Sequence, residues 1–364
     1  MSKSKVRVGV IGTSGWTEFA YLANLREHDA GEVTALAGRN EARLAEVAAQ
    51  FGIEHTFSNW RQMISSGLID AVVVASPDQQ HHEMVLAATA AGLHVLCEKP
   101  LADNADEARE MVAAVRAAGV TNNVMFTYRY SPALNYVKDL LVGGLIGKIY
   151  HSEFRYLMGY ARDSAYHWRL DADKGTGALG DLGVHVIDMA QWLIAPVTRV
   201  SASLHNSVER LHPNGTVVAP ANDSANLAVD YADGSHGSIF ATLVADLGDR
   251  EMEQTVKIFG EKGSLEVALV YDGSLKGAHV WAAQSQTGEA GRLEIPAEYL
   301  GGRETTDMWG HLLVEDVGVR QFVRNIVERT SYGPSVFDGY LAQLVIDAAF
   351  TSNHEGRRVD VTPN

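Results

Sequence analysis

A lysine beside a proline, at the predicted end of a buried strand, is the residue of this chain best suited to chemistry. Glu98-Lys99-Pro100 directly follows the apolar run Leu93–Cys97, which is short and preceded by Gly92 and therefore predicts a strand. Pro100 lacks an amide proton and disfavours helical geometry at Lys99, so the strand should end there. Ligands of open parallel sheets bind outside the carboxyl ends of the strands. Lys99 is thus placed to meet a ligand, and a solvated surface lysine is the alternative.

A second group of polar residues lies in the glycine-rich segment 175–188. Asp181 and His185 are four residues apart, so on a helix they share a face. Histidine titrates near pH ~6.5 and is a natural proton acceptor at neutral pH. Two other interpretations stay open: a metal site that also uses Asp188, and a helix-capping aspartate beside a hydrogen-bonded interior histidine. The apolar residues after the glycines recur at helical spacing and predict an amphipathic helix: Leu182, Val186, Met189 and Leu193.

A glycine-rich turn, residues 12–17, follows the first predicted strand and precedes a predicted helix. This is the context in which a dinucleotide pyrophosphate meets a helix N-terminus. Gly12 supplies the tight turn, but Ser14 and Thr17 replace the second and third glycines of the usual pattern. Gly15 would still let the backbone approach the phosphates. Alone the turn is a weak signal, and an ordinary strand–helix turn is the alternative.

The end of the second predicted strand bears on which dinucleotide would bind. An acid there accepts the ribose 2′-hydroxyl of NAD, whereas an arginine accommodates the 2′-phosphate of NADP. The chain has Gly38-Arg39-Asn40, with Arg43 one helical turn beyond Arg39 and Glu41 as the nearest acid. The pattern favours NADP(H), with NAD(H) as the alternative. An arginine that is solvated, or stacked on adenine, would also fit these residues.

The elements that would position these residues fall into two regions. Up to Gly119, strands and helices alternate and predict a doubly wound parallel sheet: strands at 6–11, 33–37, 71–75 and 93–97, and helices at 19–28, 41–51, 82–91 and 105–118. After Gly119, strands follow one another through tight turns and predict a large, mostly antiparallel sheet: 150–156, 197–205, 224–231, 236–243, 255–259 and 264–269, before a last helix at 337–354.

Composition limits the classes of protein to which the chain can belong. Its 364 residues, 46% hydrophobic and 21% charged, predict a globular protein of two domains. A net charge of −15 and a pI near 5.3 argue against a nucleic-acid or membrane-surface partner. The single cysteine, Cys97, excludes an internal disulfide. No run approaches the roughly 20 apolar residues of a membrane span, so we expect a cytoplasmic protein.

Taken together, the motifs resemble the glucose–fructose oxidoreductase/inositol dehydrogenase (Gfo/Idh/MocA) family. The matching segments are Gly12–Thr17, Ala75–Asp78 with His81, Glu98–Pro100, Arg129 with Pro132, Gly177–His185, Gly260–Glu266 and Asp338-Gly339. The resemblance implies a dinucleotide-binding Rossmann domain over 1–125 and an open-faced α/β domain over 126–364 that binds substrate and mediates oligomerisation. It also implies oxidoreduction of a sugar or polyol with a pyridine nucleotide, and a homodimer or homotetramer formed through the sheet.

The resemblance also assigns roles to residues. Lys99, Asp181 and His185 are the expected catalytic set, and Trp168 and Arg169 are expected in the pocket. The complete set of predicted cofactor contacts is Gly12, Thr13, Ser14, Gly15, Trp16, Gly38, Arg39, Arg43, Ser76, Pro77, His81, Glu98, Lys99, Arg129, Trp168 and Arg169. The predicted substrate contacts are Lys99, Asp181, His185, Tyr156, Tyr166 and His167; the aromatic members of this set could instead pack an oligomer interface.

Two other functions are compatible with these motifs. An oxidoreductive glycoside-cleaving enzyme would oxidise a sugar transiently and use its nucleotide catalytically. A nucleotide-sensing regulator on the same fold would need neither Lys99 nor His185, and this chain retains both. The sequence therefore favours the dehydrogenase.

Overall fold

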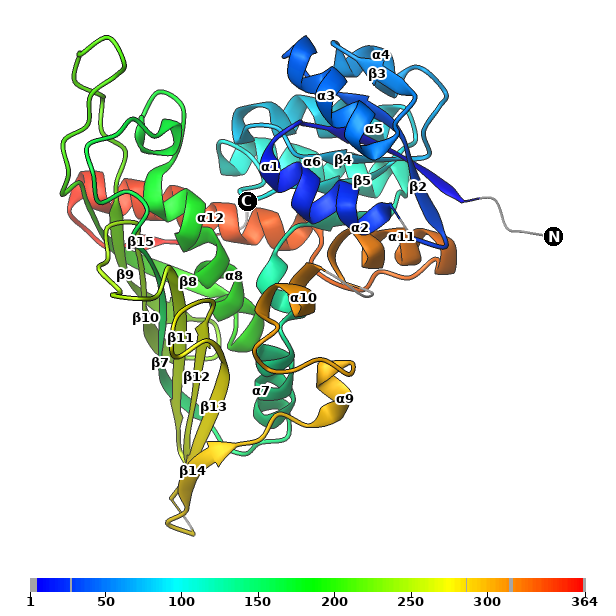
Figure 1. Ribbon diagram of the computed structural model, residues 1–364. Helices are drawn as coiled ribbons and strands as arrows, with labels where there is room; N and C mark the ends of the chain where they lie inside the picture. The colour runs from blue at the N-terminus through cyan, green and yellow to red at the C-terminus, as the bar shows by residue number, and fades with distance from the viewer. Residues whose placement is uncertain (1–4, 27, 286, 314–316, 363–364) are drawn as a thin grey trace. The chain divides into compact units, whose positions relative to one another are not determined.

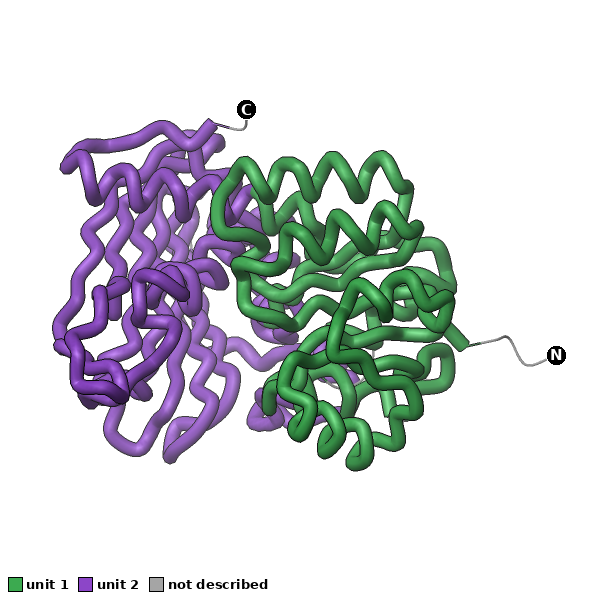
Figure 2. The backbone as a smooth tube through the Cα atoms, turned by 90° about the horizontal axis from the view of Figure 1, so that it is seen from above, with its two compact units in different colours: residues 1–127, 312–340 green, residues 128–311, 341–364 purple. Residues whose placement is uncertain are grey.

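The computed structural model describes residues 5–26, 28–285, 287–313 and 317–362. These form two compact units (Figure 2): unit 1 comprises residues 1–127 and 312–340, and unit 2 comprises residues 128–311 and 341–364. The two consecutive domains predicted from the sequence do not include this return of residues 312–340 to unit 1. Within the described ranges, no helix is both long and apolar enough to cross a membrane.

Unit 1 is built on a six-stranded sheet with the strand order β3-β2-β1-β4-β5-β6 (Figure 1). The strands are β1 (Val6–Ile11), β2 (Gly31–Ala37), β3 (His55–Phe57), β4 (Ala71–Val74), β5 (His94–Cys97) and β6 (Asn122–Val124). All neighbours pair in parallel, which confirms the predicted doubly wound sheet. The strand order reverses between β1 and β4, and ligands of such sheets bind at this switch point.

The helical segments that connect these strands are α1 (Gly15–Thr17), η1 (Glu18–Leu22), α2 (Ala23–Leu25), α3 (Glu41–Phe51), α4 (Trp60–Ile64), η2 (Asp78–Gln80), α5 (His81–Ala90) and α6 (Ala105–Ala118). Helix α11 (Gly318–Glu328) belongs to the segment that returns to unit 1. Helices α3 and α6 keep their predicted bounds, because an asparagine caps each start and a left-handed glycine follows each end. The helix predicted at 19–28 instead begins at Gly15, because the Ser14 side chain caps it there. Strands β3 and β6 were not predicted; three residues are too few to show a period.

Unit 2 is built on a nine-stranded sheet with the strand order β14-β13-β12-β11-β7-β10-β9-β8-β15. The strands are β7 (Ile149–Met158), β8 (Val197–His205), β9 (Ser224–Tyr231), β10 (His236–Thr242), β11 (Met252–Gly260), β12 (Gly263–Val270), β13 (Gly277–Gln284), β14 (Ala290–Leu293) and β15 (Val359–Asp360). Only the β7–β10 pair among them is parallel. This confirms the predicted large, mostly antiparallel sheet.

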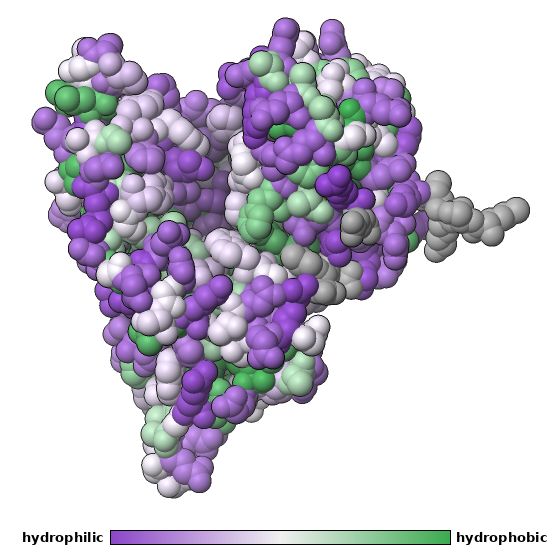
Figure 3. All heavy atoms as spheres, in the orientation of Figure 1, coloured by the Kyte–Doolittle hydropathy of each residue, from purple (hydrophilic) through white to green (hydrophobic). Residues whose placement is uncertain are grey.

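Helices cover one face of the sheet of unit 2. Helix α7 (Pro132–Val142) packs on β12 and β13, and α8 (Val184–Leu193) packs on β7 and β10 (Figure 1). The shorter segments of this unit are η4 (Trp168–Leu170), η5 (Leu179–Gly183) and α9 (Ala297–Leu300). Three segments continue from one unit into the other: η3 (Thr127–Tyr130), α10 (Met308–Leu313) and α12 (Val336–Glu355). On the face drawn in Figure 3, hydrophilic side chains predominate and hydrophobic ones are scattered among them.

The cap of α6 gives a test of the local signals. The Asn104 Oδ1 atom accepts a hydrogen bond of 3.0 Å from the Glu107 amide. We expect Asn104→Ala to lower the free energy of unfolding by about 1 kcal/mol, because the alanine leaves that amide without its acceptor. Urea denaturation at neutral pH measures the change, and Asn104→Ser, which keeps a capping oxygen, is the control. Equal stability of the alanine and serine variants would contradict the assignment of this cap.

Candidate active site

In the glycine turn of unit 1, residues 12–17, the backbone is closely packed at Gly12 and open to solvent at Gly15. Gly12 has a φ of 130°, and a Cβ atom there would lie 2.4 Å from the Ala75 carbonyl oxygen, so a larger residue would push the ends of β1 and β4 apart. The Ser14 hydroxyl accepts a hydrogen bond from the Thr17 amide at the start of the helix. A Cβ atom at Gly15 would meet nothing within 4 Å. The backbone at this helix start is therefore accessible to an anionic group.

A buried carboxylate, that of Glu98, links this helix to the end of β5. Its Oε1 atom accepts hydrogen bonds from the Trp16 indole and from the Tyr21 hydroxyl, the latter at 2.5 Å. Glu98 is only 8% exposed, and burial together with its charge raises the pKa of Tyr21 well above the usual value. The Glu98 Oε2 atom accepts from the Lys99 amide at 3.1 Å. Lys99, which is partly exposed, thus follows a residue that is anchored from two sides.

A buried histidine connects the ends of β4 and β5. His81 is 1% exposed, and its two ring nitrogens lie 2.9 Å from the carbonyl oxygens of Ser76 and Pro100. The Lys99–Pro100 peptide bond is cis. The structure therefore brings the glycine turn, the Ser76-Pro77 segment, His81 and Glu98–Lys99 together along one edge of the parallel sheet.

Arg39 and Arg43, the two arginines predicted to bind the ribose 2′-phosphate of NADP, differ in their surroundings. Arg39 is exposed directly after β2. The guanidinium of Arg43 forms ion pairs with Glu18 and Glu46 and donates to the Thr13 carbonyl oxygen at 3.3 Å. Arg43 therefore stabilises the glycine turn by its bond to the Thr13 carbonyl oxygen, whereas Arg39 is exposed to solvent near the end of β2. Gly38 lies between β2 and Arg39. A Cβ atom there would lie 2.8 Å from the Thr13 methyl group, so a larger residue would press on the glycine turn.

In unit 2, a phenol and a guanidinium hold Asp181. The Tyr160 hydroxyl donates to Oδ2 at 2.8 Å, and Arg169 Nε donates to Oδ1 at 3.2 Å. The Arg169 guanidinium also stacks over the Trp168 ring at 4.3 Å. Burial and the nearby Asp181 charge raise the pKa of Tyr160 well above its usual value. Asp181 is thus a carboxylate stabilised by two donors from one preceding loop.

His185 lies one turn further along the same helical segment and packs on aromatic rings. It is 6% exposed. The centroid of the Tyr128 ring lies 4.7 Å from that of the imidazole, in an edge-to-face arrangement, and the centroid of the Tyr156 ring lies 6.2 Å from it. The two tyrosine hydroxyls are hydrogen-bonded at 2.5 Å, and burial raises both of their pKa values. Tyr156, which the sequence predicts as a substrate contact, is 3% exposed.

A helix follows the glycines as predicted, but its first turn is π-helical, and it is buried on nearly all sides rather than amphipathic, because it lies between the sheet of unit 2 and the segments that cover it. Segment η5 carries Asp181, and the regular helix α8 then carries His185. A π-helical turn also follows the glycine turn of unit 1, in η1. Single π-helical turns occur frequently at functional sites. The start of η5 is bonded to the Asn222 side chain, so Asp181 is not needed as a helix cap.

Two loop segments of unit 2, residues 160–175 and 206–222, lie side by side. Asp171 and Pro220 form an isolated β-bridge, and the Ala172 amide donates to the Ala219 carbonyl oxygen at 2.8 Å. The Tyr166 hydroxyl donates to Asp171 at 2.9 Å, and the His167 ring lies 5.2 Å from that of Tyr160. Tyr166 and His167 therefore belong to two connected loop segments, of which residues 160–175 also carry Tyr160 and Arg169, the partners of Asp181.

Arg129 and Asp188 form a buried, two-pronged ion pair. The guanidinium donates to the two carboxylate oxygens at 2.9 and 2.6 Å, with the side chains 14% and 2% exposed. Asp188, which the sequence offered as a third metal ligand, is thus engaged by a cation. Among the described residues, no three His, Cys, Asp or Glu side chains are grouped as a metal site requires.

Comparisons with known proteins place the chain in a class. Residues 6–126 match the Gfo/Idh/MocA oxidoreductase family, which is described as having an NAD-binding Rossmann fold, and residues 134–266 match its C-terminal domain. Levoglucosan dehydrogenase of Pseudarthrobacter phenanthrenivorans is 32% identical over 90% of this chain and 88% of its own length. The chain therefore belongs to the Gfo/Idh/MocA family, as its motifs predicted.

Further relatives share this architecture. Inositol 2-dehydrogenase of Rubrobacter xylanophilus is 29% identical over 97% of this chain and 92% of its own length. A solved oxidoreductase domain protein from Kribbella flavida has a TM-score of 0.87, 28% identity and full coverage of both chains. A levoglucosan dehydrogenase structure in complex with NADH and levoglucosan has a TM-score of 0.85 and 29% identity, covering 99% of this chain and 100% of that one.

The Arg129–Asp188 pair generates a prediction about stability. We expect Arg129→Met to lower the free energy of unfolding of unit 2 by about 3 kcal/mol, because it leaves a buried carboxylate without its cation. The double variant Arg129→Met/Asp188→Leu should recover most of that loss, since no buried charge then remains. Urea denaturation of the wild type and the two variants measures this. A loss below about 1 kcal/mol in the single variant would contradict the prediction.

Proposed function

We propose that this protein is an NAD(P)-dependent dehydrogenase that oxidises, or in reverse forms, a secondary alcohol of a sugar, glycoside or cyclitol. One combination of residues carries the proposal: in a chain of this family, Lys99 follows β5 at the carboxyl edge of the parallel sheet, and Asp181 and His185 occupy one helical segment. The relatives named levoglucosan dehydrogenase and inositol 2-dehydrogenase support the substrate class.

The residues of unit 1 fit a dinucleotide. The exposed backbone at Gly15 suits a pyrophosphate, since the first turn of the helix directs its amides outward there. The Ser76-Pro77 segment and Lys99, on neighbouring strand ends, would lie along the nicotinamide half, and Arg39 would meet the adenosine ribose. When bound, the nicotinamide supplies the hydride acceptor or donor.

The proposed roles of the catalytic residues follow from their chemistry. The His185 imidazole accepts the proton of the substrate hydroxyl. Lys99 has the chemistry to donate a hydrogen bond to a substrate oxygen and to stabilise its developing negative charge. Asp181, an acceptor already supported by Tyr160 and Arg169, orients a substrate hydroxyl.

A substrate screen tests the function directly. Purified protein is incubated with sugars, glycosides and cyclitols, with NAD or NADP, and NAD(P)H absorbance is followed. A dehydrogenase accumulates reduced nucleotide in proportion to the alcohol consumed. Release of an aglycone without accumulation would instead identify redox-assisted cleavage, and turnover with no member of these classes would overturn the proposal.

Lys99 is the residue whose removal should affect chemistry most specifically. We expect Lys99→Ala to fold and to bind nucleotide, and to lose about 10²–10³-fold in kcat, as when one donor to a developing oxyanion is removed. Steady-state kinetics and nucleotide titration measure the two effects separately. Turnover close to that of the wild type would return Lys99 to the class of surface lysines.

Cofactor preference depends on Arg39 in this proposal. A 2′-phosphate would gain one charge-assisted hydrogen bond from this guanidinium, and exposure to water and salt weakens it, so we expect NADPH to bind about tenfold more tightly than NADH. Arg39→Ala should remove most of the difference, whereas Arg39→Lys should keep part of it. Fluorescence titration with each nucleotide measures this, and tighter NADH binding by the wild type would refute the assignment.

A further inference from the structure

Two adjacent residues of unit 2, Asn222 and Asp223, immediately precede β9 and lie outside the predicted site. We infer that they are positioning residues that hold Asp181 and its hydrogen-bond donor Tyr160 in register, with Arg210 as the connecting cation. The inference rests on the proposed function, because it concerns how the carboxylate that orients the substrate is held.

Asn222 holds the segment that carries Asp181. Its Oδ1 atom accepts from the Leu179 amide at 2.9 Å, and its backbone oxygen accepts from the Ala178 amide at 2.8 Å. Ala178 and Leu179 lie shortly before Asp181, separated from it by Gly180 alone. The fit is close, because Gly177 has a φ of 70° and a Cβ atom there would lie 2.2 Å from the Asn222 oxygen. The carboxylate is thereby fixed relative to the start of β9.

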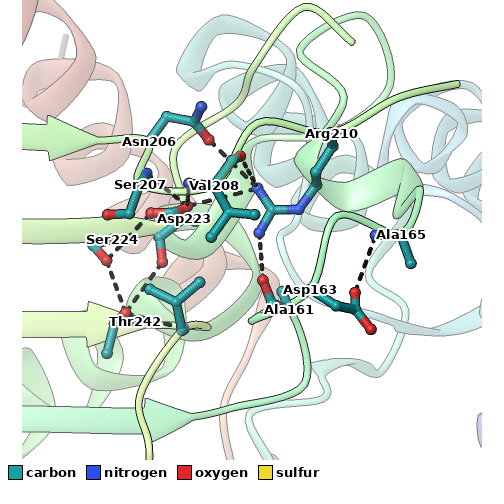
Figure 4. A network of polar contacts seen from close by, with 11 residues as sticks. Ala161, Asp163, Ala165, Asn206, Ser207, Val208, Arg210, Asp223, Ser224 and Thr242 are labelled. Atoms are coloured by element: carbon teal, nitrogen blue, oxygen red, sulfur yellow. Dashed lines mark hydrogen bonds and ion pairs between the residues drawn. The ribbon is translucent and has the colours of Figure 1, made fainter. Parts of the chain in front are cut away.

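Asp223 holds the loop that carries Tyr160, through Arg210. Figure 4 shows the Arg210 guanidinium between Asp223 and the Ala161 carbonyl oxygen. The guanidinium lies 3.6 Å from the carboxylate, and the side chains are 3% and 0% exposed. The Asp223 Oδ2 atom also accepts from the amides of Ser207 and Val208 at 2.8 and 3.1 Å. The donor loop at Ala161 and the loop after β8 are thus fixed to one buried carboxylate.

The two connections meet at the hydrogen bond between Tyr160 and Asp181. Ala161 follows Tyr160 directly, so Asp223 fixes the donor while Asn222 fixes the acceptor. A buried ion pair is weak evidence for stability, since apolar side chains of similar volume often serve as well. Its value here is geometric, because a misplacement of about 1 Å in a substrate-positioning group can cost about 10²-fold in rate.

Kinetics of single and double variants test the inference. We expect Asp223→Asn and Asn222→Ala each to lower kcat/KM for the alcohol about 10- to 100-fold, with the Kd of the nucleotide unchanged. Tyr160→Phe removes the bond that both residues serve. When Tyr160 is already replaced by phenylalanine, adding Asp223→Asn should therefore lower kcat/KM by a further factor of less than about three. Arg210→Lys, which keeps the cation, should retain more activity than Arg210→Gln.

A matched control separates positioning from stability. Val229 lies further along β9 and is 1% exposed, so Val229→Ala destabilises the same strand without touching either connection. Effects of Asp223→Asn and Asn222→Ala on kcat/KM that are no larger than that of Val229→Ala would overturn the inference, and so would an effect of Asp223→Asn that adds fully to that of Tyr160→Phe. If one variant does not fold, the other carries the test, because Asn222 and Asp223 act through different contacts.

Hydrogen exchange gives a readout that does not need a substrate. Asn222→Ala should accelerate amide exchange in the peptide covering residues 178–182, whereas Val229→Ala should not. Unchanged exchange there would also overturn the inference. If the wild type oxidises no sugar or cyclitol, the proposed function fails, and the exchange data still decide whether Asn222 holds this segment.

Discussion

The arrangement of unit 1 depends on the Glu98 carboxylate, which is buried at the end of β5 and accepts hydrogen bonds from Trp16 and Tyr21. Burial of a carboxylate without donors costs several kcal/mol, so the helix that supplies the two donors must stay against this strand end. That helix begins at the glycine turn. The same contact therefore sets the turn relative to Lys99, one residue beyond Glu98, before any ligand binds.

Three aspartates of unit 2 illustrate the same physics. Asp181, Asp188 and Asp223 are each paired with an arginine from another segment, and each pair ties a loop or helix to the sheet or to its covering layer. The carboxylates of Asp188 and Asp223 are 2% and 0% exposed, whereas that of Asp181 is 14% exposed. Two of these carboxylates are thus closed to solvent, whereas that of Asp181 keeps some exposed surface that a hydroxyl group can reach.

The aromatic rings that pack against His185 are uncharged. Tyr128 and Tyr156 stay protonated because burial raises their pKa values, so neutral phenols rather than charges line that side of the imidazole. Relatives with the same architecture bear the names of different dehydrogenases, including ones for levoglucosan and inositol. A shared fold does not choose the substrate. We propose that in this chain the two adjacent loop segments, residues 160–175 and 206–222, make that choice.

The sequence by itself determined that a parallel sheet precedes a mostly antiparallel one, the bounds of α3 and α6, and the place of Lys99 at a strand end. These follow from local signals: periodicity, asparagine caps, left-handed glycines and a proline stop. Only the tertiary structure decided that Trp16 and Tyr21 bond to Glu98, that Arg43 supports the glycine turn, and that Asn222 and Asp223 hold the surroundings of Asp181. Such partners lie tens of residues apart or more, and no local pattern specifies them, because strand pairing and loop packing bring them into contact.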